Sequence, residues 1–182
     1  LSLYGTLKNV RIIENPRNIG VVQTVSRLVI EAKNNCCVLC DQDDVWLDNK
    51  AEIILRSFED HNYFAAFSNA YLVDSMLKTT GLLLPQNFDF IKSSANILHC
   101  NFVTGCTLAV RREILISMLP FPVGIPHDYW VAANCSLTQN LKYINTPLVK
   151  YRQHESNVIG VGDFSIAKKV QRLMDFGRVM ER

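Results

Sequence analysis

The sequence predicts an α/β fold in which a mostly parallel central sheet is flanked by helices. Short runs of apolar and β-branched residues alternate with segments whose apolar residues recur every three or four positions. Such alternation of strands and helices is typical of parallel pairing. The chain has 182 residues, which is enough for one domain with a hydrophobic core. Polar clusters follow several of the predicted strands, at the edge where such sheets bind ligands.

The first part of the chain is predicted to contain three strands and two helices. Strands are expected over residues 10–13, 36–40 and 63–67. The first helix follows a loop at residues 14–20. Its apolar stripe comprises Val21, Val25, Leu28 and Ala32. The second helix is expected to use Asp48 as its N-cap. Its buried stripe comprises Ala51, Ile54, Leu55 and Phe58.

The second part is predicted to begin with turns between residues 75 and 100. It continues with a strand over 103–110, helices over 111–118 and 128–137, and a strand over 143–151. These elements complete a domain over residues 1–162, and residues 163–182 are predicted to form an amphipathic helix. The basic face of that helix comprises Lys168, Lys169, Arg172 and Arg178. This face either remains in solvent or rests on anionic lipid.

Composition and charge narrow the class of protein. Hydrophobic residues make up 48% and charged residues 20% of the chain, as in ordinary globular proteins. The net charge of +2 gives no reason to expect a nucleic-acid partner. No apolar run reaches the roughly 18 residues that a membrane span requires. The six cysteines are irregularly spaced within apolar runs, which favours reduced, buried thiols and a cytosolic location. The C-x-x-C spacing at residues 37–40 lacks the second pair that a zinc site needs.

The most informative feature is an acidic cluster directly after the predicted strand at residues 36–40. Asp41, Asp43 and Asp44 lie within four positions, and an extended chain would place Asp41 and Asp43 on one face. Paired carboxylates are ligands that hard divalent cations prefer. The alternative is that these acids are merely solvated or cap the next helix. An EF-hand is rejected, because Trp46 stands where the loop requires glycine.

Two later clusters carry further candidate site residues. Asp128 lies between His127 and two aromatic residues, and it is either a helix cap or a general base. Near the end of the last strand, Arg152 is suited to binding phosphate. His154 is suited to completing the shell of a divalent ion. A fourth cluster, at residues 101–106, contains Gly105, which would let the backbone approach a ligand or another strand.

In this order, the clusters resemble the family 2 glycosyltransferases of bacterial polysaccharide synthesis, and especially their rhamnosyltransferase-like branch. The resemblance covers about residues 10–162. No single motif carries it, but several motifs in the family's order are specific together. The matching segments are residues 15–20, 39–46, 101–107, 126–130 and 151–154.

The resemblance implies a GT-A fold and an inverting transfer of a sugar from a nucleotide-sugar donor to a glycan or lipid-linked acceptor. It also implies Mg²⁺ or Mn²⁺ as cofactor, because Asp41 and Asp43 match the family's D-x-D motif. Asp44 matches an adjacent acid at the donor site, and His154 matches a histidine near the metal or diphosphate. Asp128 matches the catalytic base. The cysteines predict a cytoplasmic location, and the basic face of residues 163–182, if it rests on anionic lipid, would place the protein at the inner face of the plasma membrane.

The sequence also departs from the family pattern. Nothing before Val10 matches the family's first nucleotide-binding strands, so we expect a partial GT-A domain with an exposed sheet edge. Asn69 stands where relatives often have aspartate, and Asn34 and Asn35 replace a usual Gly-Asp pair. The alternative function is therefore a non-catalytic or degenerate module that binds glycan or nucleotide.

Overall fold

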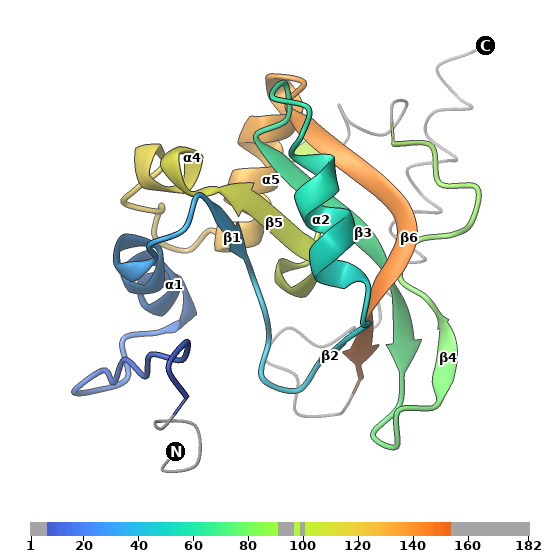
Figure 1. Cartoon of the computed structure of the whole chain (residues 1–182), viewed down its shortest axis with the longest axis horizontal. Helices are drawn as coiled ribbons and strands as arrows, with labels where there is room; N and C mark the ends of the chain where they lie inside the picture. The colour runs from blue at the N-terminus through green and yellow to red at the C-terminus, as the bar shows by residue number, and fades with distance from the viewer. Residues whose placement is uncertain (1–6, 91–96, 99–100, 154–182) are drawn as a thin grey trace.

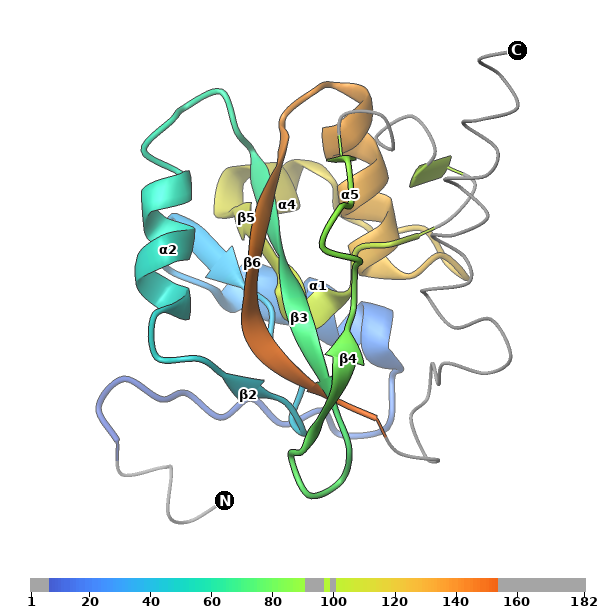
Figure 2. The same cartoon turned by 90° about the vertical axis from the view of Figure 1, so that its right-hand side faces the viewer.

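The computed structural model describes residues 7–90, 97–98 and 101–153. They form three layers, with one sheet between two layers of helices (Figure 1). The helix α2 covers one face of the sheet, and α1, α4 and α5 cover the other (Figure 2). In chain order the elements are α1 (Val21–Glu31), β1 (Cys36–Val38), β2 (Val45–Trp46), α2 (Lys50–Ser57), β3 (Ala65–Val73), β4 (Thr79–Leu82), the 3₁₀ helix η2 (Gly105–Thr107), β5 (Leu108–Arg111), α4 (Arg112–Ser117), α5 (His127–Leu137) and β6 (Leu141–Arg152).

The sheet confirms the α/β class but is mixed, not mostly parallel as the sequence predicted. Its strand order is β1-β5-β3-β6-β2, and β4 pairs with β3 outside that path. Within the described residues, β3 and β6 form the only parallel pair, and the other four pairings are antiparallel. The prediction failed because β2, β4 and β5 enter the sheet from loops or a short 3₁₀ turn and not from crossover helices. One edge of β1 has no partner strand among the described residues.

Alternate residues of β3 face the two layers of helices. Ala65 and Phe67 belong to the large core beneath α1, α4 and α5, whereas Ala66 belongs to the smaller core beneath α2. In β5, Ala109 likewise faces α2 while its neighbours face the large core. This alternation follows from the period of two in a strand. The two cores fix β3 and β6, the strands that lead to the site.

The amino-terminal elements differ from the prediction in two respects. Residues 10–13 form no strand. Helix α1 lies where it was predicted, but Val22, Val25 and Val29 face the core, while Leu28 is 48% exposed. The prediction was right for Val25 but wrong for Val21 and Leu28, because the helix is apolar on more than one side and sequence spacing alone does not select the side.

Elsewhere the predicted elements are present with shifted bounds. In the predicted stripe of α2, Ile54 and Phe58 are buried, but Ala51 and Leu55 are exposed. Helix α2 begins at Lys50 after Asn49, not after Asp48, and β3 is longer than the predicted strand at 63–67. The predicted strand at 103–110 is divided into η2 and β5. The strands β2 and β4 were not predicted, because each is too short to give an alternating pattern.

The predicted helix over residues 163–182 lies outside the described residues, so the division into 1–162 and 163–182 stays a prediction. Within the part of the chain that the structure describes, no helix combines the length and apolar character required to span a bilayer.

Candidate active site

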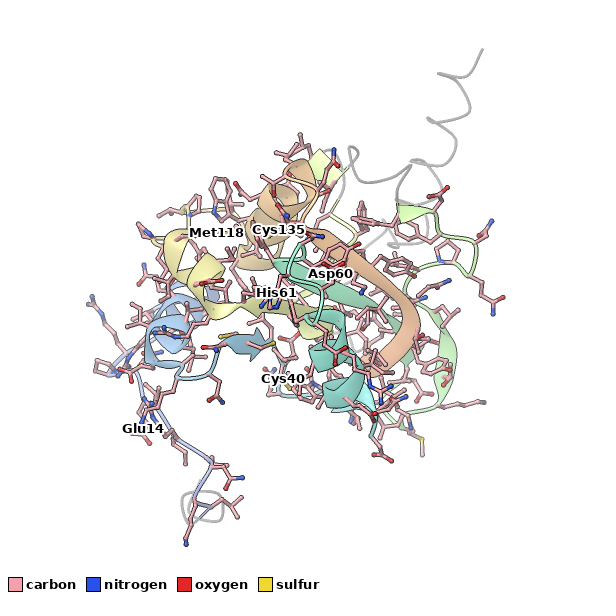
Figure 3. All side chains as sticks on the ribbon, turned by 45° about the horizontal axis from the view of Figure 1, so that its top comes forward. Glu14, Cys40, Asp60, His61, Met118 and Cys135 are labelled. Atoms are coloured by element: carbon pink, nitrogen blue, oxygen red, sulfur yellow. The ribbon has the colours of Figure 1, made fainter. Side chains whose placement is uncertain are left out.

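The acidic loop, residues 41–44, connects β1 and β2, the two outermost strands in the strand order of the sheet. Pairing of β1 with β5 extends to Leu39, whose N–H donates to the Leu108 carbonyl at 3.0 Å. The loop then begins after Cys40, which Figure 3 labels, and leads into β2, which pairs with β6. The loop therefore crosses from β1 to the carboxyl-terminal end of β6.

The structure groups the acids differently from the sequence prediction. One carboxylate oxygen each of Asp41 and Asp44 and the Sγ of Cys106 all lie within 4.8 Å of one another. Asp43 is not part of this group. The alternation argument does not apply to the loop, because residues 42 and 43 form a turn and not an extended strand. The role of Asp43 as a metal ligand stays a prediction.

Asp44 has one satisfied and one unsatisfied oxygen. Its Oδ1 accepts a hydrogen bond of 2.9 Å from the backbone N–H of Arg152. Its Oδ2 is buried and has no hydrogen-bond partner among the residues that the structure describes. Burial raises the pKa of Asp44, against the opposing effects of the Arg152 amide and the Cys106 thiol. A buried carboxylate oxygen without a donor is the position at which a cation would be most stabilising.

The charges of the loop also interact with Asp128. Loss of solvent raises the pKa of Asp41, and the negative charges of Asp44, Asp43 and Asp128 raise it further. Lys50 acts in the opposite direction. Asp128, which is 87 positions away from Asp41 in the sequence, therefore lies within electrostatic reach of the acidic loop.

Asp128 lies in the first turn of α5, and two backbone N–H groups hold its carboxylate. Its Oδ2 accepts from the N–H of Gly105 at 3.0 Å, and its Oδ1 accepts from the N–H of Tyr129 at 2.7 Å. The N-cap of α5 is Pro126, so Asp128 is not the capping residue that the alternative required. Burial lowers the pKa of the neighbouring His127, whose ring also lies close to Gly105.

Arg152 fastens the acidic loop to the sheet. Its Nε donates to the Asp43 carbonyl at 2.8 Å, and its Nη1 donates to the Ser75 carbonyl at 2.6 Å. The predicted contact of this side chain with phosphate stays a prediction. His154, the third predicted metal ligand, lies outside the described residues.

Three further residues reach the site but were not predicted as members of it. Lys50 and Cys106 are buried, and Tyr151 is half-buried. Burial raises the pKa of Tyr151 to about 12, and the negative charges of Asp44 and Asp41 act in the same direction. A signal for Cys106 existed, because it ends the predicted cluster at residues 101–106. A single lysine six positions after the acidic loop carries no comparable signal.

The residues present fit a divalent cation bound through oxygen. Asp41 and Asp44 supply adjacent carboxylates, and the unpartnered Oδ2 of Asp44 is available as a ligand. Burial raises the pKa of Cys106 well above its ordinary value. A neutral thiol is a poor ligand for Mg²⁺, so Cys106 lines the site beside the acids.

Comparison with known proteins identifies the family of the chain. Residues 3–119 match Glycosyl transferase family 2. The chain is 21% identical over 82% of its length to the UDP-Glc:alpha-D-GlcNAc-diphosphoundecaprenol beta-1,3-glucosyltransferase WfgD of Escherichia coli, of which it covers 58%. It is 28% identical over 73% of its length to the dTDP-rhamnosyl transferase RfbG of Shigella flexneri, of which it covers 47%. The chain thus spans about half the length of these curated relatives. Because the family match extends over more than half of the sequence, the chain belongs to glycosyl transferase family 2.

Proposed function

We propose that this chain carries the acceptor-side base and the cation site of an inverting glycosyltransferase of polysaccharide synthesis. The observation that supports this most strongly is the convergence of both acidic groups on one turn. Asp128 accepts the N–H of Gly105, while Asp41 and Asp44 lie beside the thiol of the next residue, Cys106. A carboxylate and an acidic cation site that face each other in this way suit a direct displacement at a sugar carbon.

In this proposal Asp128 removes the proton from the acceptor hydroxyl as that oxygen attacks the anomeric carbon. The backbone N–H groups of Gly105 and Tyr129 fix the carboxylate in place, and its remaining lone pairs can receive the proton. The bond to the nucleoside diphosphate breaks on the opposite face of the sugar, which inverts the anomeric configuration. When bound, Mg²⁺ or Mn²⁺ would stabilise the negative charge that develops on the departing diphosphate. Asp41 and Asp44 would hold that ion, together with the predicted ligands Asp43 and His154.

The relatives suggest which donors and acceptors to test. The printed names of the two relatives refer to UDP-glucose and to dTDP-rhamnose as donors. One of them also specifies a diphosphoundecaprenol-linked acceptor. We propose a donor of this nucleotide-sugar class and a glycan or lipid-linked acceptor. A lipid-linked acceptor would bring the enzyme to the cytoplasmic face of the membrane.

The test is transfer by the intact natural protein with UDP-glucose, dTDP-rhamnose and related donors in the presence of Mn²⁺. Asp128→Asn should lower kcat by at least about 100-fold, because an amide cannot take the proton. Donor binding by calorimetry should stay the same, because Asp128 acts on the acceptor and the amide oxygen can still accept the N–H of Gly105, although the hydrogen bond from the N–H of Tyr129 is lost.

Asp48→Asn is the matched control, since Asp48 is an exposed acid just beyond the loop. It should retain wild-type turnover. Near-normal kcat in Asp128→Asn would contradict the role of the base. Binding of a nucleotide sugar without transfer to any acceptor would instead support the alternative of a non-catalytic binding module.

A further inference from the structure

A buried cation lies behind the candidate active site. Lys50 is 0% exposed, although lysine is among the residues that proteins bury least often. It is also the first residue of α2, where a positive charge opposes the helix dipole. Two local rules are thus broken at one position, and such violations are concentrated at functional sites.

The contacts of Lys50 join two parts of the site. Its Nζ donates a hydrogen bond of 2.7 Å to the carbonyl of Cys106 and lies 4.2 Å from the centroid of the Trp46 ring. Burial lowers the pKa of Lys50 to about 8, while the nearby negative groups, which include Asp44 and Asp41, oppose this shift. The ammonium group therefore contacts η2 and β2 and lies within electrostatic reach of the acidic loop.

We propose that Lys50 is a positioning residue for the transfer reaction, whose ammonium group fixes the η2 turn against the acidic loop and thereby sets the place of Asp128. This inference rests on the function proposed above. The connection is short, because Lys50 holds the carbonyl of Cys106 and the preceding residue, Gly105, donates its N–H to Asp128.

The charge of Lys50 has a second consequence for the acidic loop. It offsets part of the repulsion between Asp41 and Asp44, whose carboxylates approach each other closely. The same charge repels an incoming cation. Loss of the ammonium group should therefore disturb the turn and the position of Asp128, but it should not weaken cation binding.

The test is Lys50→Met, which keeps a side chain of similar length and removes both the charge and the hydrogen-bond donor. We expect kcat to fall about 100-fold, because small displacements of a catalytic group are costly. Mn²⁺ affinity, measured by electron paramagnetic resonance, should stay the same or increase. The amide of Gly105 should exchange with solvent at least tenfold faster by NMR. The Tm should be unchanged or higher, because replacing a buried charge with an apolar group is often stabilising.

Lys142→Met is the matched control. Lys142 also lies over an aromatic ring, with Nζ 5.0 Å from the centroid of Tyr63, but its contacts are at the other end of β6. This variant should leave kcat, Mn²⁺ affinity and the exchange of Gly105 unchanged. Lys50→Gln keeps a neutral donor and should recover part of the lost kcat.

A purely structural role would lower the Tm, the Mn²⁺ affinity and kcat together, and that result would overturn the proposal. Unchanged kcat with unchanged exchange of Gly105 would overturn it as well. So would a failure of both Lys50→Met and Lys50→Gln to fold, which would make Lys50 a requirement of folding. If the wild-type protein transfers no sugar, the proposed function fails. The Mn²⁺ affinity and the exchange of Gly105 still decide in that case whether Lys50 positions the turn.

Discussion

At the scale of single residues, the carboxylates of the acidic loop repel one another. Asp41 and Asp44 both have a raised pKa, first because of lost solvent and then because of neighbouring carboxylates. An acid whose pKa is higher in the folded than in the unfolded state holds its proton more tightly when folded. The contribution of such an acid to folding stability therefore decreases as the pH rises from its pKa in the unfolded state to its higher pKa in the folded state. At neutral pH the cation-free site costs stability, and a bound divalent ion would offset this cost.

Asp41→Asn should therefore raise the Tm of the cation-free protein at pH 7 by about 1–3 °C, because it removes one repelling charge from the loop. The same substitution should abolish the increase in Tm that Mn²⁺ gives the wild-type protein. Thermal unfolding followed by circular dichroism, with EDTA or with Mn²⁺, measures both effects.

The pH dependence gives an independent check of this repulsion. The wild-type protein should gain Tm relative to Asp41→Asn as the pH falls from 7 toward the raised pKa of Asp41, because protonation then relieves the repulsion. Asp48→Asn should behave as the wild type throughout. A lower Tm for Asp41→Asn in EDTA at pH 7 would show that the loop acids stabilise the cation-free fold.

At the scale of elements, α2 has a clear division between its buried and exposed sides. Ile54 is 0% exposed and packs against Ala66, Ala109 and Leu148 on the outer face of the sheet. Leu55, the next residue, is 58% exposed. Because α2 carries Lys50 at its start, the packing of Ile54 also determines where the first turn of the helix lies.

Ile54→Ala should lower the free energy of unfolding by about 2–4 kcal/mol, because it leaves a cavity in the small core beneath α2. Leu55→Ala, the matched control in the same helix, should change it by less than about 0.5 kcal/mol. Urea denaturation of both variants measures the difference. Equal losses in the two variants would show that α2 is rotated relative to the arrangement described above.

The sequence could predict where the helices lie along the chain, but not always which side of a helix is buried. The positions of α1, α2 and α5 follow from spacing and from proline and glycine signals, and the structure places these helices close to their predicted ranges. The buried side of α1 could not be predicted, because Val21, Val22, Val25 and Leu28 are all apolar and only packing distinguishes them. The short strand β2 forms only because β6 offers it a partner, which is information that no local pattern contains.

The candidate site was predictable to a similar extent. Asp41 and Asp128 carried signals from the residues around them, and the structure brings them within electrostatic reach. The pairing of Asp44 with Cys106, and the burial of Lys50, depend on how the loop turns and on what η2 places opposite it. Those features arise from tertiary contacts over about sixty positions and therefore could not be derived from spacing.

At the scale of the whole molecule, the site exists only when segments from distant parts of the chain meet. The acidic loop, η2, the first turn of α5 and the end of β6 each contribute a group to it. Hydrogen bonds from backbone amides to carboxylates link these segments in two pairs: the Gly105 amide of η2 donates to Asp128, and the Arg152 amide of β6 donates to Asp44. The two pairs meet where Asp41 and Asp44 lie beside the Cys106 thiol of η2. A ligand that orders one segment should therefore stabilise the others.

Binding of Mn²⁺ with UDP or dTDP should slow hydrogen exchange in all four segments together, at residues 40–47, 104–107, 127–130 and 150–153. The physical reason is that local opening of any one segment would break hydrogen bonds or ion contacts made by the next. Hydrogen exchange with mass spectrometry measures this, and the turn at residues 58–62, between α2 and β3, is the internal control. In that turn the Oδ1 of Asp60 accepts the N–H of Asn62, and the turn precedes β3 at the end away from the acidic loop, so its exchange should not change. Protection confined to residues 40–47 would mean that the acidic loop binds the ion without engaging Asp128, and it would separate the cation site from the proposed base.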